Sequence, residues 1–194
     1  MNDKEKIDFY PDSKLISVYR DIMCQQRPEA LPEIYRLMQE EEVEVVVEVG
    51  TFCGGLSLYL ADRDYCEIHT FDIVDKNPSL PINNKLFKYL DNAFSESCKE
   101  KITKITQDKK TLWLFDGGDK MKEAEFYSDI VKKGELVMLH DFAPDSNCFK
   151  YLQENNIWLW HESNSSRIDF NLYEEHKNFE KLWKTIVWGC FRKK

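Results

Sequence analysis

The feature of this sequence that most constrains its fold is a valine-rich run that ends in a glycine-containing loop. Residues 43–49 read VEVVVEV, so valine occupies all but two positions. A nearly unbroken run of β-branched residues indicates a strand that is buried on both faces, as in parallel sheets. Gly50, Gly54 and Gly55 follow, and residues 56–61 begin a helical pattern. A buried strand, a glycine loop and a helix in this order predict an α/β protein.

The same alternation of strand and helix continues toward the C-terminus. Further strands are predicted at residues 67–73, 111–115, 135–139, 157–160 and 185–191. Helices are predicted at residues 96–107 and 120–131, and at 81–89 unless a short strand at 87–91 takes its place. Right-handed crossovers would place helices on both faces of a largely parallel sheet. No long helical pattern separates the last two strands, so we expect them to form an antiparallel hairpin at the sheet edge.

The segment before the valine-rich strand is expected to be helical. It offers two apolar helical faces, one built from Leu15, Val18, Tyr19 and Ile22 and the other from Leu31, Ile34, Tyr35 and Met38. We therefore predict a helical cap over residues 1–42 and an α/β domain over residues 43–194. The length of 194 residues suits one domain with such an addition.

Composition and charge narrow the classes of partner. The net charge is −8, and no basic run is long enough to form a nucleic-acid surface. No stretch approaches the ~20 apolar residues of a membrane span, and the N-terminal residues lack the apolar core of a signal peptide. The six cysteines show no paired CxxC spacing. We expect a cytoplasmic protein that binds a small molecule rather than nucleic acid or a membrane, and a homo-oligomer is left open.

Polar side chains and glycines stand where the predicted strands end. In an open α/β sheet this edge is where ligands bind. Gly50 permits a tight exit from the first strand, and Asp72 ends the second strand 22 residues later. An acid in that place accepts hydrogen bonds from ribose hydroxyls. Phe52 stands where the dinucleotide motif G-x-G-x-x-G requires glycine. The alternatives are an ordinary turn and a helix-capping aspartate.

Two further strand ends carry acidic residues. Asp116 and Asp141 end strands that are predicted to be neighbours, so their carboxylates are expected to converge. Paired carboxylates suit a hard cation such as Mg²⁺. His140 would either face the core or act as a base, and the alternative for both aspartates is helix capping.

Four segments together resemble the class I S-adenosylmethionine-dependent methyltransferases. The segment EVGTFCGGLSLYLA (48–61) is similar to motif I, E-x-G-x-x-x-G, of catechol O-methyltransferase-like enzymes. LWLFDGGDK (112–120) and VMLHDF (137–142) resemble the macrocin-type O-methyltransferase and cephalosporin-hydroxylase-like group. TIVWGCF (185–191) is similar to the last, antiparallel strand of that fold.

This resemblance implies a Rossmann-like methyltransferase fold, with a seven-stranded, mostly parallel sheet whose last strand is antiparallel. It implies S-adenosylmethionine binding at Glu48, Gly50, Thr51, Gly54, Gly55, Ser57, Asp72, Asp91, Asn92 and Asp116. In the metal-dependent branch, the cation ligands correspond to Asp116, His140 and Asp141.

The sequence departs from that pattern at two places. His140 stands where the metal-dependent branch has an acid or amide, and imidazole binds Mg²⁺ less readily than oxygen does. The base lysine of the catechol-type enzymes corresponds to Asp119, and Lys120 comes one residue later. The candidates for the catalytic base are therefore His140 and Lys120.

The function predicted from the sequence is O-methylation of a small hydroxylated acceptor, with Mg²⁺ as an optional second cofactor. The first alternative is a non-catalytic or hydroxylase-like protein of the same fold. The second is a nicotinamide-dependent oxidoreductase, which the missing dinucleotide motif and the C-terminal hairpin argue against.

Overall fold

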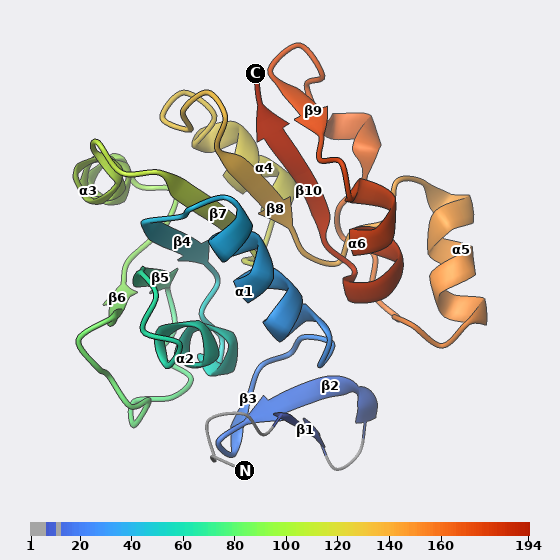
Figure 1. Cartoon of the computed structure of the whole chain (residues 1–194), viewed down its shortest axis with the longest axis horizontal. Helices are drawn as coiled ribbons and strands as arrows, with labels where there is room; N and C mark the ends of the chain where they lie inside the picture. The colour runs from blue at the N-terminus through green and yellow to red at the C-terminus, as the bar shows by residue number, and fades with distance from the viewer. Residues whose placement is uncertain (1–6, 11–12) are drawn as a thin grey trace.

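A seven-stranded sheet forms the centre of the computed structural model, which describes residues 7–10 and 13–194 (Figure 1). The strand order is β6-β5-β4-β7-β8-β10-β9. Its strands are β4 (Val45–Val49), β5 (Glu67–Asp72), β6 (Leu86–Leu90), β7 (Thr111–Phe115), β8 (Leu136–Leu139), β9 (Tyr173–Glu175) and β10 (Gly189–Lys193). All pairs are parallel except those that β10 makes with β8 and β9. The predicted seven strands with an antiparallel last strand are confirmed.

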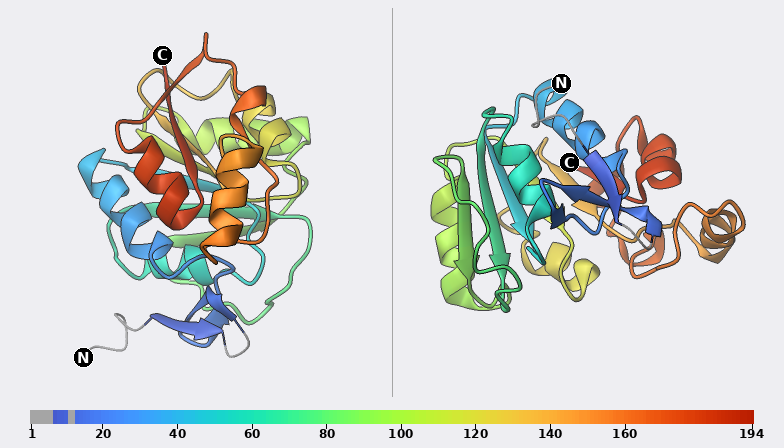
Figure 2. Two further views of the ribbon diagram at one scale, coloured as in Figure 1. Left: turned by 90° about the vertical axis from the view of Figure 1, so that its right-hand side faces the viewer. Right: turned by 90° about the horizontal axis from the view of Figure 1, so that it is seen from below.

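Helices cover both faces of this sheet, as predicted (Figure 2). The helices are α1 (Ala30–Glu40), α2 (Gly55–Ala61), α3 (Glu96–Thr106), α4 (Lys120–Phe126), α5 (Ser146–Glu154) and α6 (Phe179–Ile186). Apolar residues of α1 and α2 pack on one face and those of α3, α4 and α5 pack on the other, whereas α6 contributes apolar residues to both clusters. In the described chain, no helix combines the length and apolar character that crossing a membrane requires.

The valine-rich strand β4 lies in the middle of the sheet, and all five of its residues are buried. Val46 packs into one core, whereas its neighbours Val45 and Val47 pack into the other. This alternation follows from the period of two in a strand, and burial on both faces is the reason for the near-continuous valine run. In register, Val49 pairs with the last apolar residues of β5 and β7, so the three carboxyl ends meet at one edge.

The predicted helix around residues 15–22 is wrong. A three-stranded antiparallel sheet occupies this region, with β1 (Ile7–Tyr10), β2 (Ser13–Tyr19) and β3 (Ile22–Met23). Arg20 and Asp21 both have positive φ, at 50° and 63°, which is the geometry of a two-residue hairpin turn. The apolar spacing that suggests a helix is produced instead by the hairpin, whose strands pack beside α2. The helical prediction holds for α1, and the boundary at residue 42 stays a prediction.

The predicted helix at residues 81–89 is also wrong, and the alternative strand is present as β6. The side-chain oxygen of Asn83 accepts hydrogen bonds from the backbone N–H groups of Lys85 and Leu86, at 2.7 and 2.9 Å. Such an Asn turn satisfies the backbone without a helix and directs the chain into the sheet. The pairing of Leu86 with Ile68 then places β6 at the sheet edge.

The C-terminal region differs from the prediction in the position of its edge strand. Residues 157–160 form no strand, because Ile157 continues the end of α5 and Trp158 is buried against the polar cluster described below. The antiparallel edge pair is formed by β9 and β10, but α6 lies between them, so the predicted hairpin is wrong. The helix α5 was not predicted, and the last strand begins only at Gly189.

Candidate functional site

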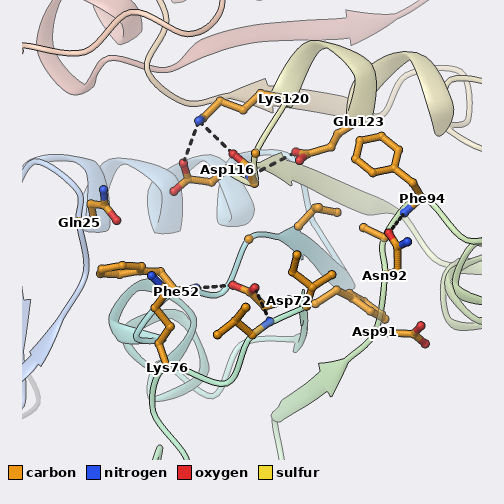
Figure 3. Close-up of a pocket in the computed structure, with 18 of the residues that line it drawn as sticks. Gln25, Phe52, Asp72, Lys76, Asp91, Asn92, Phe94, Asp116, Lys120 and Glu123 are labelled. Atoms are coloured by element: carbon orange, nitrogen blue, oxygen red, sulfur yellow. Dashed lines mark hydrogen bonds and ion pairs between the residues drawn. The ribbon is translucent and has the colours of Figure 1, made fainter.

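A cavity of about 580 Å³ opens at the carboxyl ends of β4, β5 and β7 (Figure 3). Five of the predicted cofactor-binding residues line it, namely Gly50, Asp72, Asp91, Asn92 and Asp116. The predicted residues Lys120 and Asp141 also line it, whereas His140 does not. The other predicted cofactor residues lie behind the cavity wall and are Glu48, Thr51, Gly54, Gly55 and Ser57. The sequence therefore located the edge of the sheet that carries the cavity.

Gly50 brings the first loop against the end of β7. Its φ is +97°, and a Cβ atom there would lie 2.3 Å from the carbonyl oxygen of Asp116. Its N–H donates to the carbonyl oxygen of Phe71 at 2.8 Å, and the N–H of Asp116 donates to Val49 at 2.8 Å. Only glycine combines this backbone conformation with such a close approach. The loop is therefore fixed to both neighbouring strands at the cavity floor.

The buried residues behind the loop support it from within. The Ser57 hydroxyl donates to the carboxyl group of Glu48, and the hydroxyls of Thr51 and Thr70 lie 2.6 Å apart. Burial raises the pKa of Glu48 to about 7, although the hydrogen bond from Ser57 acts in the opposite direction. Gly55 packs against the carbonyl oxygen of Met23, so the N-terminal sheet touches the start of α2. That these residues contact a cofactor stays a prediction.

Asp72 presents a fixed carboxylate to the cavity. One oxygen accepts from the backbone N–H of Phe52 at 2.9 Å, and the other accepts from the N–H of Val74 at 3.0 Å. Each carboxylate oxygen has a second lone pair. Two such oxygens in a set orientation can accept hydrogen bonds from a pair of vicinal hydroxyls.

Apolar side chains lie beside Asp72 on the same side of the cavity. Phe94 and Ile73 are both cavity-lining and exposed. The Asn92 side chain accepts from the backbone N–H of Phe94 at 3.0 Å, which fixes the turn after β6. Asp91 accepts from Lys101 at 2.6 Å. Exposed apolar groups beside fixed polar groups are typical of a pocket for a planar ring with a polar edge.

A cluster of charged side chains lies at the ends of β7 and β8. Asp116 accepts from Gln26 at 2.6 Å through one oxygen and lies 2.7 Å from His140 Nδ1 through the other. Asp141 accepts from Trp158 Nε1 at 2.6 Å through one oxygen and lies 3.1 Å from Lys120 Nζ through the other. Asp116 and Asp141 therefore converge, as the sequence predicts.

Lys120 is buried at the centre of this cluster. Its ammonium group also donates to the carboxyl group of Glu162 and to the carbonyl oxygen of Gly117, the latter at 3.2 Å. Burial by itself lowers the pKa of Lys120, but the carboxylates of Asp116, Asp141 and Glu162 outweigh it, and the pKa is raised. A lysine that holds its proton this firmly is poorly suited to the predicted role of base.

His140 is buried behind Asp116. Its ring centroid lies 5.4 Å from that of Trp158 and 4.8 Å from that of Trp188. Burial lowers the pKa of His140, but the neighbouring carboxylates of Asp116 and Asp141 outweigh it, and the pKa is raised. Because the ring does not line the cavity, His140 is placed to orient Asp116 rather than to contact a ligand.

The predicted metal ligands do come together, since ligand atoms of Asp116, His140 and Asp141 lie within 4.8 Å of one another. Their lone pairs, however, face hydrogen-bond donors. Every carboxylate oxygen of the two aspartates has a nitrogen within 3.1 Å, and one of those nitrogens is the ammonium of Lys120. A divalent cation that used the remaining lone pairs would lie beside these donors, and the ammonium of Lys120 would repel it. The donor set as arranged does not fit Mg²⁺.

Several residues of the site were missed by the sequence analysis. Gln26 comes from the segment after β3, and Glu162 comes from the loop after α5. Glu123 of α4 is buried at the cavity wall, where it accepts from the N–H of Gly117 at 3.3 Å. Burial raises the pKa of Glu123 to about 7. Of these three residues, only Glu123 could have been found from the sequence, as an acidic residue on the apolar face of a predicted helix.

Solved structures of methyltransferases are similar to this chain in fold. A Staphylococcus aureus protein assigned as a caffeoyl-CoA O-methyltransferase is 18% identical, with a TM-score of 0.56 over 86% of this chain and 83% of that one. CmcI in a structure with SAH is 10% identical, with a TM-score of 0.65 over 95% and 84%. The chain has the methyltransferase fold. No family model and no curated protein matches the sequence.

Two further structures of this fold contain bound SAM. Human N-acetylserotonin methyltransferase in complex with SAM is 13% identical, with a TM-score of 0.52 over 86% of this chain and 52% of that one. CmcI with Mg and SAM is 10% identical, with a TM-score of 0.57 over 91% and 76%. At these identities the methyltransferase fold is what the likeness establishes, and the chemistry of this chain has to be argued from its own side chains.

Proposed function

We propose that this protein is an S-adenosylmethionine-dependent methyltransferase that acts on an oxygen atom of a small hydroxylated molecule. The main observation behind the proposal is the carboxylate of Asp72. Two backbone N–H groups hold it in the cavity at the carboxyl ends of the strands of a methyltransferase fold. The cofactor is a nucleoside with a ribose diol, an adenine ring and a charged sulfonium group. Each of these parts has a counterpart in the cavity.

The cofactor would lie across the carboxyl ends of β4, β5 and β6. Asp72 would accept hydrogen bonds from the ribose hydroxyls, and Asn92 with Phe94 and Ile73 would contact the adenine. Gly50 would let the backbone approach the cofactor without a side chain in between. The acidic groups of Asp116 and Glu123 would favour a sulfonium cation and an ammonium group beside them.

The acceptor would bind at the charged end of the cavity, near Lys120. S-Adenosylmethionine supplies an electrophilic methyl group, so the protein's main task is to align the acceptor oxygen with it. Glu162 is half exposed, whereas Asp116 and Asp141 are mostly buried, with 50%, 17% and 12% of their side-chain surface accessible. Glu162 is therefore best placed to receive the proton of the acceptor hydroxyl, at Oε1, because Oε2 accepts from Lys120 Nζ.

Calorimetric titration with S-adenosylmethionine and S-adenosylhomocysteine tests the cofactor part of this proposal. We expect saturable binding of both by the wild-type chain, and at least about tenfold weaker binding by Asp72→Ala, because charge-assisted hydrogen bonds are lost. Asp129→Ala is the control, since Asp129 is exposed and pairs with Lys99 away from the cavity. Absence of binding by the wild type would refute the proposal, and binding of NADH instead would favour an oxidoreductase.

The transfer itself is tested by the release of S-adenosylhomocysteine with a panel of phenols, sugar hydroxyls and hydroxy acids. We expect release with hydroxylated acceptors and none with matched compounds in which a methoxy group replaces the hydroxyl. Release that depends on an amine or a thiol instead would contradict O-methylation while leaving the cofactor assignment intact.

A further inference from the structure

We infer that the ammonium group of Lys120 takes the place of a divalent cation in this site, so that the chain binds no metal at Asp116, His140 and Asp141. The functional consequence rests on the proposed function: if the chain transfers methyl groups, it does so without a metal ion. The absence of a metal site is argued independently of that function, from the side chains of the cluster alone.

The first argument is the occupation of the carboxylate oxygens. The two oxygens of Asp116 face Gln26 Nε2 and His140 Nδ1, at 2.6 and 2.7 Å. The two oxygens of Asp141 face Trp158 Nε1 and Lys120 Nζ, at 2.6 and 3.1 Å. Each oxygen keeps one further lone pair, but a metal ion bound there would lie beside these nitrogen donors, one of which is a charged ammonium.

The second argument is that those donors are themselves held in place. Gln26 is fully buried, and its side-chain oxygen accepts from Trp188 Nε1 at 2.8 Å. Trp158 is also buried and packs against the ring of His140. Turning either donor away would leave buried polar groups without partners, which is costly. The buried donors therefore hold Asp116 and Asp141 as hydrogen-bonded carboxylates and not as metal ligands.

The third argument is the position of the ammonium group itself. Only 3% of the Lys120 side chain is exposed, and Nζ lies 3.1 Å from Asp141 and 3.9 Å from Asp116 while also contacting Glu162. It thus lies between the carboxylates, where it neutralises part of their charge. A divalent ion bound to both aspartates would stand close to this ammonium, and the two positive charges would repel each other strongly in a buried place.

The local structure explains why Lys120 reaches this position. Asp119 caps α4 by accepting from the N–H of Lys122 at 3.1 Å, which makes Lys120 the first helical residue. The Lys120 side chain then points toward Asp116 (Figure 3), and Nζ donates to the carbonyl oxygen of Gly117. The residue that precedes it, Asp119, is used as a helix cap, so the cation is supplied from the next position.

Calorimetric titration of the full chain with Mn²⁺ tests this inference. The wild type is expected to show no saturable binding in the micromolar range. Lys120→Met removes the charge but keeps a long apolar chain, and it is expected to bind Mn²⁺ at least about tenfold more tightly than the wild type. Lys122→Met is the matched control, because Lys122 lies on the exposed side of the same helix and should leave the result unchanged.

The outcomes separate clearly. Saturable micromolar binding by the wild type would overturn the inference, and so would a folded Lys120→Met variant with no gain in binding. Circular dichroism establishes whether the variant is folded, and Lys120→Gln is the second neutral variant. If neither folds, the wild-type titration decides alone. S-Adenosylmethionine titrated into the same wild-type sample distinguishes failure of the proposed function from failure of this inference.

Discussion

The two ends of the cavity are built in different ways. The end beside Asp72 is made mostly from backbone, since Gly50 lies against the Asp116 carbonyl and Asp72 is held by two main-chain N–H groups. The end beside Lys120 is made from side chains, with Gln26, Trp158 and Glu162 arriving from distant segments. A nucleoside can be recognised by a fixed backbone, whereas a charged cluster needs side chains that saturate one another. The two ends should therefore respond differently to mutation.

Substitution of Gly50 should have the largest effect. Gly50→Ala would place Cβ 2.3 Å from the Asp116 carbonyl oxygen and would force alanine into a φ of +97°. We expect the free energy of unfolding to fall by more than about 3 kcal/mol, because neither the backbone clash nor the strain can be relieved locally. Urea denaturation measures this.

Gly118→Ala is the control for that substitution. Gly118 has no neighbouring atom within 4 Å of an added Cβ, and its φ lies outside the strained range. Its unfolding free energy should change by less than about 0.5 kcal/mol. Equal effects of the two substitutions would show that the first loop is not fixed by backbone contact.

Substitution of Asp141 should have the next largest effect and should act on the side-chain end. Asp141→Asn keeps the oxygen that accepts from Trp158 and tolerates the residue's φ of +51°, but it turns an amide toward Lys120. We expect a loss of about 2 kcal/mol in unfolding free energy, since a buried ammonium loses one of its carboxylate partners. Thermal or urea unfolding measures it.

Glu162→Gln is the matched comparison, because it removes another carboxylate from the same ammonium. Half of the Glu162 side chain is exposed, so its ion pair is screened by solvent. We expect a change of less than about 0.5 kcal/mol. A larger loss with Glu162→Gln than with Asp141→Asn would contradict the burial argument for the cluster.

The backbone-built end of the cavity could also be predicted from the sequence more fully than the end built from side chains. Gly50 and Asp72 were found from the sequence because the signals are local, a glycine after a strand and an acid at the next strand end. The convergence of Asp116 and Asp141 was also found, because neighbouring parallel strands end at one edge. Gln26 could not be found, since it lies 90 residues from its partner Asp116 and carries no motif. Lys120 was found as a candidate, but only its surroundings show which proton state it keeps.

The N-terminal segment shows the corresponding limit for the fold. Its apolar residues fit the spacing of a helix, yet two residues with positive φ make a hairpin. Non-glycine residues adopt that conformation only in particular contexts, and nothing in Arg20-Asp21 announces it. In contrast, the valine run could be placed correctly because burial on both faces leaves few alternatives. Where a single turn decides between a hairpin and a helix, the spacing of apolar residues does not predict the secondary structure.

The smallest predicted effect concerns the protonation of Glu48 under the first loop. Burial raises its pKa in the folded protein to about 7, above the value of about 4.3 for an exposed glutamate. The folded state therefore binds more protons than the unfolded state between these pH values. Its contribution to stability is complete below about pH 4 and is lost as the pH rises through 7.

Glu48→Gln isolates this contribution, because glutamine keeps an oxygen for the Ser57 hydroxyl and does not titrate. The unfolding free energy of the wild type should fall relative to that of the variant by about 1 to 2 kcal/mol between pH 5 and pH 6.5. Urea denaturation at several pH values measures the difference, in which the titration of all other groups cancels. Parallel pH profiles would mean that Glu48 is ionised in the folded protein at pH 5, and the backbone-built end of the cavity would then rest on a buried charge.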